Sequence, residues 1–417
     1  MVLLILLSFL GMNSLHAGEY AEEEVDQNEG LTLQNIAVLQ YKTLDDFMSA
    51  VGPTFMSVNN GVGMAIGVIQ QGQAPKTYFF GESEKGSGKK PNGSTIFMIG
   101  SVSKTFTATL LALYVQRQLV TLADNLQTYV PAGVTVPTFM AQPQQITLET
   151  LATHTSGLPR NPPIPPGNTG GFSNDQLFQS LNQTTLLSAP GDKYLYSNDG
   201  FALLGQALAK VGNKTWGELI AQEISTPLGM VDTKVEAQLD GPELGRRAQG
   251  YRANGMPAPY RMPGFPSGNP AGGLYSTMDD MIKYLSFVMG MTNSPLNSLR
   301  PTLFQPRHPA GPNGKVALGW QMSSLSGTNY QVIYKPGSTA GFVAYIGFVP
   351  ETGNGIVLLL NFLASKQMIA LGQEILKYLV QQPVSINPNQ KATPALENRG
   401  TVGPGPVERP QNPLRSQ

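Results

Sequence analysis

Apolar residues form short runs of β-strand character near both ends of the central part of the chain. Residues 62–69 are rich in Val, Ile and small residues, and residues 76–81 follow after turn-forming residues, so these two runs predict a hairpin. Residues 340–349 and 355–362 are separated by the turn sequence Pro-Glu-Thr-Gly-Asn and predict a second hairpin. Together the runs predict one antiparallel sheet assembled from distant parts of the chain.

A helical pattern follows the last of these runs. Within residues 365–380, Met368, Leu371, Ile375 and Leu379 recur at helical spacing. This periodicity predicts an amphipathic helix whose apolar face packs on the sheet.

The middle of the chain, about residues 105–285, is mostly helical and loop sequence. Helices are expected at residues 201–211 and 215–224, and proline-rich connections such as residues 158–167 separate them. This order predicts an α+β body with a helical insertion. A cleft between the sheet and the insertion is the expected place for a functional site.

The two ends of the chain lack these patterns. Residues 1–17 contain an apolar run too short to span a bilayer and are predicted to be a secretory signal peptide, although no basic residue precedes that run. Residues 18–30 form an acidic leader without a basic residue, and residues 383–417 form a proline-rich tail that is predicted to be disordered. The folded body is expected to span residues 31–382. The processed protein is expected to be periplasmic or secreted, with no integral membrane segment.

The composition narrows the chemistry. The chain of 417 residues has no cysteine and 3 histidines, which excludes disulfides, cysteine nucleophiles and thiolate metal ligands, so no metal site or cofactor is expected. Lys and Arg number 27, as do Asp and Glu, which gives no reason to expect nucleic acid as a partner. Without the acidic leader and the tail, residues 30–382 carry about +4, which suits anionic substrates. Catalysis here must use Ser, Lys, Tyr or carboxylates.

The first candidate motif is Ser101-x-x-Lys104, at the start of an apolar-periodic helix. Residues three apart share one helix face, so the Lys104 amine can touch the Ser101 hydroxyl, whereas Ser103 points elsewhere. A helix N-terminus also offers unpaired backbone N–H groups to a developing oxyanion. The same pattern occurs at residues 87–90 in a Gly-rich loop, and a helix cap followed by a solvated lysine is the structural alternative.

The second candidate motif is Tyr196-x-Asn198, in a polar loop that leads into the helix expected at residues 201–211. A phenol can relay a proton, and an amide can bind a substrate peptide group. The structural alternative is a turn with a helix N-cap.

The third candidate motif is Lys335-x-Gly337, followed by Ser338, just before a strand expected to begin near Ala340. A cation there can bind a substrate carboxylate, and a glycine allows a second backbone oxyanion donor to come close. An ordinary turn at the entry to a strand is the structural alternative.

In this order the motifs resemble those of the serine β-lactamase and penicillin-binding protein family, specifically its class C type. Further segments that resemble the family are residues 100–106, 151–159, 226–230, 272–281 and 337–342. Residues 129–160 are most similar to the branch of periplasmic D-alanyl-D-alanine carboxypeptidase/endopeptidases. The resemblance covers about residues 40–380. It implies a β-lactamase/transpeptidase-like α+β fold for residues 31–382, in which an antiparallel sheet is flanked by helices from both chain ends and a helical subdomain, about residues 105–285, is inserted.

The resemblance implies catalytic roles for Ser101, Lys104 and Tyr196. Ser101 attacks a carbonyl carbon to form an acyl-enzyme, and Lys104, Tyr196 or both accept its proton. Because free Lys and Tyr side chains have pKa values of about 10, neighbouring cations such as Lys335 are expected to favour the deprotonated form of one of them.

The resemblance also implies the substrate-binding residues. Asn198 is expected to bind the substrate amide, and Lys335 the substrate carboxylate next to Gly337. The backbone N–H groups of Ser101 and Ser338 are the expected oxyanion hole.

One position departs from the family pattern. Relatives usually carry Thr in the third motif, where this chain has Pro336. The lost hydroxyl favours acylation by a β-lactam over its efficient hydrolysis. His154 is interpreted as structural, because a site built on Ser, Lys and Tyr needs no imidazole. Trp216 and Trp320 are interpreted as packing residues.

The implied function is that of a DD-carboxypeptidase/endopeptidase that acts on D-Ala-D-Ala peptides of peptidoglycan and binds β-lactams. A class C β-lactamase would share every residue named here. An esterase on the same fold and a non-catalytic penicillin-binding relative are further alternatives. The sequence predicts no oligomeric state.

Overall fold

The computed structural model describes residues 41–140, 144–163, 173–259 and 266–382. The expected signal peptide (1–17), the acidic leader (18–30) and the proline-rich tail (383–417) lie outside these residues. In the described part of the chain, no helix has both the length and the apolar character that a bilayer-spanning helix needs.

An antiparallel sheet of 8 strands forms the centre of the fold. From edge to edge its strands are β2 (Lys76–Gly81), β1 (Gly63–Ile69), β11 (Asn354–Leu360), β10 (Val343–Val349), β9 (Gln331–Ser338), β8 (Gln321–Ser324), β7 (Lys315–Val316) and β6 (His308–Pro309). Both predicted hairpins are present, and β1 pairs with β11 from the other end of the chain. The prediction of one sheet assembled from distant segments is confirmed.

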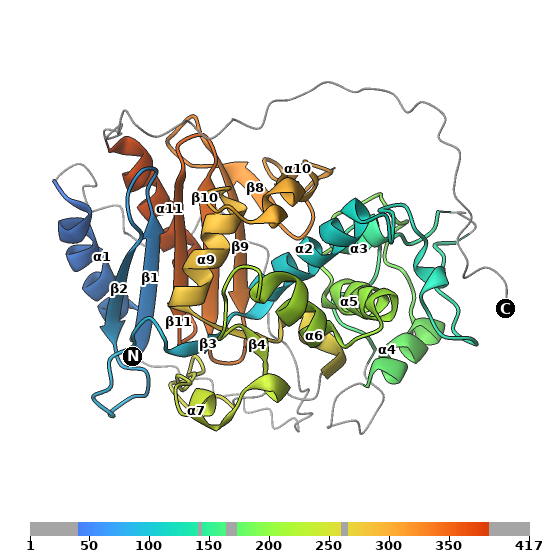
Figure 1. Cartoon of the computed structure of the whole chain (residues 1–417), viewed down its shortest axis with the longest axis horizontal. Helices are drawn as coiled ribbons and strands as arrows, with labels where there is room; N and C mark the ends of the chain where they lie inside the picture. Colours follow the sequence, from blue (N-terminus) through green and yellow to red (C-terminus); the bar gives the residue numbers. More distant parts are fainter. Residues whose placement is uncertain (1–40, 141–143, 164–172, 260–265, 383–417) are drawn as a thin grey trace, which may run out of the picture.

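One face of this sheet is covered by helices from the two ends of the described chain, α1 (Leu44–Val58) and α11 (Ser365–Gln381) (Figure 1). The apolar residues predicted to face the sheet from α11 are all buried. Phe47 of α1 stacks on Tyr378 of α11 with ring centroids 4.0 Å apart. The expectation of a sheet flanked by terminal helices is therefore confirmed.

The other face packs against α9 (Met278–Val288) and the helical part of the molecule (Figure 1). The sheet therefore has one hydrophobic core on each face, and successive side chains of a strand point into opposite cores. In β11, for example, Leu358 points into the core with α1 and α11, and Leu359 into the core with α9. With both faces covered, β10 and β11 are buried at every position.

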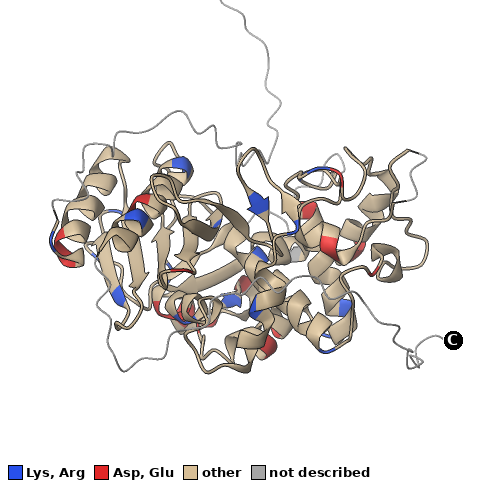
Figure 2. Ribbon diagram, turned by 90° about the horizontal axis from the view of Figure 1, so that it is seen from above, with Lys and Arg blue, Asp and Glu red and all other residues tan. Residues whose placement is uncertain are grey.

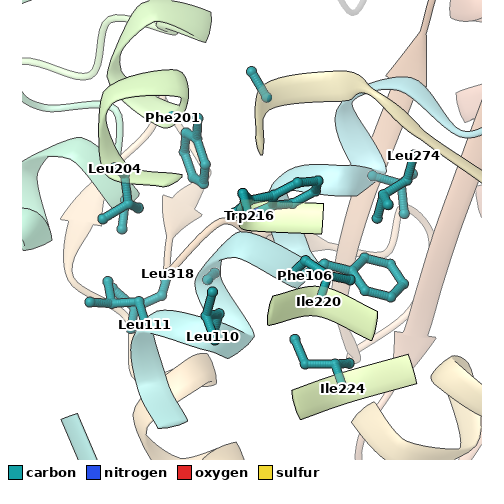
Figure 3. Close-up of a cluster of buried hydrophobic side chains, with 14 of the residues drawn as sticks. Phe106, Leu110, Leu111, Phe201, Leu204, Trp216, Ile220, Ile224, Leu274 and Leu318 are labelled. Atoms are coloured by element: carbon teal, nitrogen blue, oxygen red, sulfur yellow. The ribbon is translucent and has the colours of Figure 1, made fainter. Parts of the chain in front are cut away.

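Helix α2 (Ser103–Gln116) runs through the middle of the helical part and is buried along most of its length. Its side chains pack against α5 (Asn198–Gly212) and α6 (Trp216–Ile220), and Figure 3 shows Phe106, Phe201 and Trp216 in this core. Because α2 is buried on nearly all sides, its apolar residues need not gather in a single stripe.

The remaining elements are short. They comprise α3 (Leu148–Ala152), α4 (Asn174–Ser180), α7 (Gly241–Leu244), α8 (Asn269–Gly272), α10 (Arg300–Phe304) and a second sheet of β3 (Ile96–Met98), β5 (Leu274–Thr277) and β4 (Lys234–Val235). The sequence patterns did not predict this second sheet.

Two expectations about element boundaries are wrong. The third motif lies inside β9, and not in a turn before a strand that begins near Ala340; β10 begins at Val343. Pro336 and Gly337 are poor strand formers, but pairing with β10 holds them in the sheet. The helix expected at residues 215–224 is α-helical only in α6, and a π-helical turn continues it through residues 221–225.

Candidate active site

Ser101 lies in a 3-10 turn, η3 (Gly100–Val102), between β3 and α2. The α-helix itself begins at Ser103, two residues later than the motif suggested. The Ser101 side chain is only 7% exposed. Its Oγ accepts hydrogen bonds from Lys104 Nζ at 3.0 Å and from Tyr196 Oη at 2.7 Å. The first two motifs therefore meet at one hydroxyl.

Lys104 is fully buried, and its amine has three oxygen neighbours. Nζ lies 3.0 Å from Ser101 Oγ, 2.8 Å from Asn198 Oδ1 and 2.6 Å from the carbonyl oxygen of Ala271. An ammonium group donates to all three oxygens. A neutral amine donates to two of them and accepts the Ser101 proton with its lone pair. The same geometry thus serves both protonation states of the lysine.

Three cations surround the ring of Tyr196. Lys104 Nζ and Lys335 Nζ each lie 4.8 Å from the ring centroid, and the Arg160 guanidinium carbon lies 5.0 Å from it. Lys335 is 1% exposed, so water screens its charge weakly. These distances are those of cation–π contacts with the ring.

The end of β9 approaches the nucleophile turn closely. A Cβ on Gly337 would lie 2.2 Å from the carbonyl oxygen of Ile99 and 2.9 Å from the backbone nitrogen of Ser101. Gly100 has φ +51°, and a Cβ on it would lie 2.8 Å from the backbone nitrogen of Ser338. Only glycine fits at either position. The Ser101 and Ser338 nitrogens, expected to form the oxyanion hole, thus belong to two backbone segments that meet without an intervening side chain.

Asn198 is the first residue of α5 and is half-buried. Its Oδ1 accepts from Lys104, and its Nδ2 donates to Asn161 Oδ1 at 3.0 Å. These two bonds fix which end of the amide faces the lysine.

His154 packs directly against the Tyr196 ring, with ring centroids 4.3 Å apart. It is 1% exposed, and burial, followed by the charges of Lys335, Lys104 and Arg160, holds the pKa of its imidazole well below the usual range. The ring is therefore neutral at physiological pH.

Pro336 lies opposite Tyr345 in the pairing of β9 with β10. Tyr345 belongs to the core on the α11 side of the sheet, and alternation along β9 puts Pro336 on that same side, away from Lys335. A Thr hydroxyl at this position, as relatives carry it, would therefore lie on the face of β9 opposite the Lys335 side chain.

The structure brings all the candidate residues together: Ser101, Lys104, Tyr196, Asn198, Lys335, Gly337 and Ser338. The second Ser-x-x-Lys match does not take part, because Ser87 lies in an exposed turn where its hydroxyl donates to the carbonyl oxygen of Glu84. Sequence reasoning missed three groups at the site, namely the Ala271 carbonyl, Asn161 and Arg160. Only Arg160 had a sequence indication, as the end of a segment that resembles the family.

Figure 2 shows Lys and Arg positions and Asp and Glu positions scattered over many elements of the ribbon. Within the described residues, no group of three or more His, Asp or Glu side chains is arranged to hold a metal ion.

Comparison with known proteins gives consistent matches. Residues 54–379 match the protein family described as Beta-lactamase. A protein of Escherichia coli (strain K12) named D-alanyl-D-alanine-carboxypeptidase/endopeptidase AmpH is 30% identical over 312 residues, which are 71% of this chain and 78% of that protein. The solved structure of a beta-lactamase/D-alanine carboxypeptidase from Pseudomonas syringae has a TM-score of 0.71 at 24% identity and covers 81% of this chain and 99% of its own, which shows a common fold. Another, described as a class C beta-lactamase, has a TM-score of 0.70 at 25% identity and covers 81% of this chain and 98% of its own.

Proposed function

The chain belongs to the beta-lactamase family and is a serine hydrolase of that family, and from this premise we propose that it cleaves D-Ala-D-Ala peptides of peptidoglycan through an acyl-enzyme on Ser101. One observation carries the proposal: the buried Ser101 hydroxyl is hydrogen-bonded to both Lys104 and Tyr196. A serine flanked by two potential bases is the arrangement that nucleophilic catalysis needs.

Acylation begins when Ser101 Oγ attacks the carbonyl carbon of the scissile amide. The Ser101 proton passes to the Lys104 amine or to the Tyr196 phenolate. The backbone N–H groups of Ser101 and Ser338 stabilise the oxyanion of the tetrahedral intermediate. The C–N bond then breaks, the same base returns the proton to the leaving nitrogen, and the acyl group remains as an ester on Ser101.

Deacylation repeats these steps with water. The base takes a proton from water, the resulting hydroxide attacks the ester carbonyl, and the proton returns to Ser101 Oγ as the carboxylic acid leaves. In a β-lactam the leaving nitrogen stays attached through the ring, so it remains near the ester and obstructs water. A long-lived acyl-enzyme is therefore expected with β-lactams.

The substrate class rests on charge and on one relative. Lys335 and Lys104 place positive charge beside the nucleophile, which favours a peptide with a free C-terminal carboxylate. The relative at 30% identity is named a D-alanyl-D-alanine-carboxypeptidase/endopeptidase. Both observations support a DD-peptidase.

A class C β-lactamase is the second candidate, because a structure of that description matches over 81% of this chain. The two candidates differ in how fast water attacks the acyl-enzyme. Release of D-alanine from a peptide that ends in D-Ala-D-Ala, measured beside nitrocefin turnover, separates them. Peptide turnover with slow nitrocefin hydrolysis supports the peptidase, and the reverse supports the lactamase.

Replacement of the nucleophile tests the site itself. Ser101→Ala should lower both activities by roughly 10³-fold or more, while the matched control Ser87→Ala, in the exposed second motif, should leave them unchanged. Full activity in the Ser101→Ala protein would refute the proposed nucleophile.

Export to the periplasm or the medium is part of the same proposal, because peptidoglycan peptides lie outside the cytoplasm. The apolar pattern of residues 1–17 supports it. Fractionation of cells that express the full chain tests it: the protein should leave the cytoplasm and lose these residues, and an uncleaved protein in the cytosol would contradict export.

A further inference from the structure

The segment that contains His154 runs alongside the segment that contains Tyr196 and is hydrogen-bonded to it. The carbonyl oxygen of His154 accepts from Leu195 N at 2.7 Å, and its Nδ1 accepts from Ser197 N at 3.1 Å. His154 thus holds the backbone on both sides of Tyr196, with its main-chain carbonyl at Leu195 and with its imidazole at Ser197. Its ring also lies against the Tyr196 ring at 4.3 Å, with 30° between the two planes.

The Ser197 hydrogen bond defines the state of the imidazole. An imidazole that accepts at Nδ1 is neutral and carries its proton on Nε2. Nε2 is buried and has no hydrogen-bond partner among the described residues. The neutral state is also the one that burial and the positive charges of Lys335, Lys104 and Arg160 favour, because both lower the pKa of the imidazole.

A purely structural role would not require histidine here. The residue has φ +58°, a conformation that strains most side chains, and its buried N–H group has a desolvation cost. An apolar ring would fill the same volume between Tyr194 and Phe201. What an apolar ring cannot do is accept the Ser197 N–H while its face supports the Tyr196 ring.

We propose that neutral His154 is a positioning residue that fixes the Tyr196 phenol against Ser101. The inference rests on the proposed role of Tyr196 in acylation. The phenol has only one oxygen, and its hydrogen bond to Ser101 is 2.7 Å long. A loosened backbone at residues 195–197 would move that oxygen out of line, while the Ser101–Lys104 contact would remain.

A double-mutant cycle on the rate constant for acylation by a fluorescent penicillin tests this inference. His154→Phe keeps an aromatic ring and removes the acceptor. His154→Asn keeps an acceptor close to the position of Nδ1, tolerates the positive φ, and removes the ring. Each change is made in the wild-type protein and in Tyr196→Phe, which lacks the phenol oxygen.

A matched control separates positioning from stability. Phe55→Leu, in α1 on the other side of the sheet, should lower the unfolding midpoint and leave the acylation rate constant unchanged. Unfolding midpoints are recorded for every variant.

His154→Phe should lower the acylation rate constant of the wild-type protein at least 10-fold, and that of Tyr196→Phe less than two-fold. His154→Asn should recover part of the loss in the wild-type background. Equal losses in both backgrounds, or no loss from either change, would overturn the inference. If His154→Phe does not fold, the inference is tested by comparing the loss in acylation rate constant that His154→Asn causes in the wild-type protein with the loss it causes in Tyr196→Phe. A wild-type protein that no penicillin acylates would instead refute the proposed function.

Discussion

Asp199, next to Asn198 in the first turn of α5, is a buried acid that the proposed chemistry does not use. It is 0% exposed, and within the described part of the chain neither of its carboxyl oxygens has a hydrogen-bond partner. Burial raises its pKa from 3.8 to about 7. The carboxyl is therefore protonated over much of the pH range in which an unfolded chain would carry a carboxylate.

This difference predicts a pH-dependent stability. Below about pH 4 the Asp199 carboxyl is protonated in both the folded and the unfolded protein. As the pH rises towards 7, the carboxyl loses its proton in the unfolded protein only, so ionisation increasingly favours unfolding. Asp199→Asn removes this effect. The variant should gain stability over the wild type between pH 4 and pH 7, by up to about 4 kcal/mol, in urea unfolding curves measured across that range.

The matched control is Asp175→Asn, an exposed acid in the first turn of α4. Its difference from the wild type should stay nearly constant over the same pH range. Parallel stability profiles for Asp199→Asn and the wild type would show that the buried carboxyl is not protonated in the folded state.

For individual residues, the sequence predicted the polar side chains of the candidate site but not the groups that contact them. Ser101 and Lys104 could be paired because three residues along a helix set a fixed distance. The Ala271 carbonyl could not be found, because every residue has one and only the tertiary fold directs it at Lys104. The contact of His154 with Tyr196 was missed for the same reason.

At the level of the elements, β9 and the turn η3 approach each other backbone to backbone. Gly337 and Gly100 let two backbones meet without an intervening side chain. The oxyanion hole proposed here needs one N–H group from each element, so its geometry depends on this contact.

Gly337→Ala tests that dependence. Its methyl group would collide with the Ile99 carbonyl and push β9 away from η3. Because a displacement of about 1 Å can cost roughly 100-fold in rate, the acylation rate constant should fall by that factor or more. The rate of labelling by fluorescent penicillin measures it.

Gly241→Ala is the control, since a Cβ at that position meets nothing within 4 Å. It should acylate at the wild-type rate. Wild-type acylation by Gly337→Ala would show that the close approach of β9 is not needed for catalysis.

Several of the longer elements were predicted from the sequence, whereas α1, α9 and the shortest strands were not. The strands of the hairpins are long enough to show as β-rich apolar runs between turn residues, and α11 is long enough for a period of 3.6 to emerge. The strands β4, β6 and β7 have 2 residues each, too few for any period. The strand β9 was misjudged because Pro336 and Gly337 oppose strand formation locally, and its neighbours in the sheet decide the outcome.

The whole molecule has two cores, one on each face of the sheet. Ser101, Lys104 and Tyr196 lie on the side of α2, whereas α1 and α11 close the other core. The order of segments along the chain predicted the sheet but not this separation, which depends on how alternate side chains divide between the faces.

The separation predicts that stability and catalysis can be changed independently. Phe47→Ala removes a buried ring that stacks on Tyr378 at 4.0 Å and should cost roughly 3–5 kcal/mol of unfolding free energy. Because the site lies beyond the sheet, the acylation rate constant of the folded protein should stay within two-fold of the wild type. A combined urea-unfolding and penicillin-labelling experiment at low temperature checks both values, and a large loss of rate in fully folded protein would contradict the separation.

We propose that the Ser101 hydroxyl, activated by Lys104 and Tyr196, is the group that becomes acylated. Peptide mapping by mass spectrometry after incubation with benzylpenicillin identifies the acylated residue. The peptide containing Ser101 should gain the mass of one whole penicillin molecule, because the opened ring releases no leaving group, and Ser101→Ala should gain none. A label on another residue, or a wild-type protein that neither retains a label nor hydrolyses benzylpenicillin, would refute acylation at Ser101.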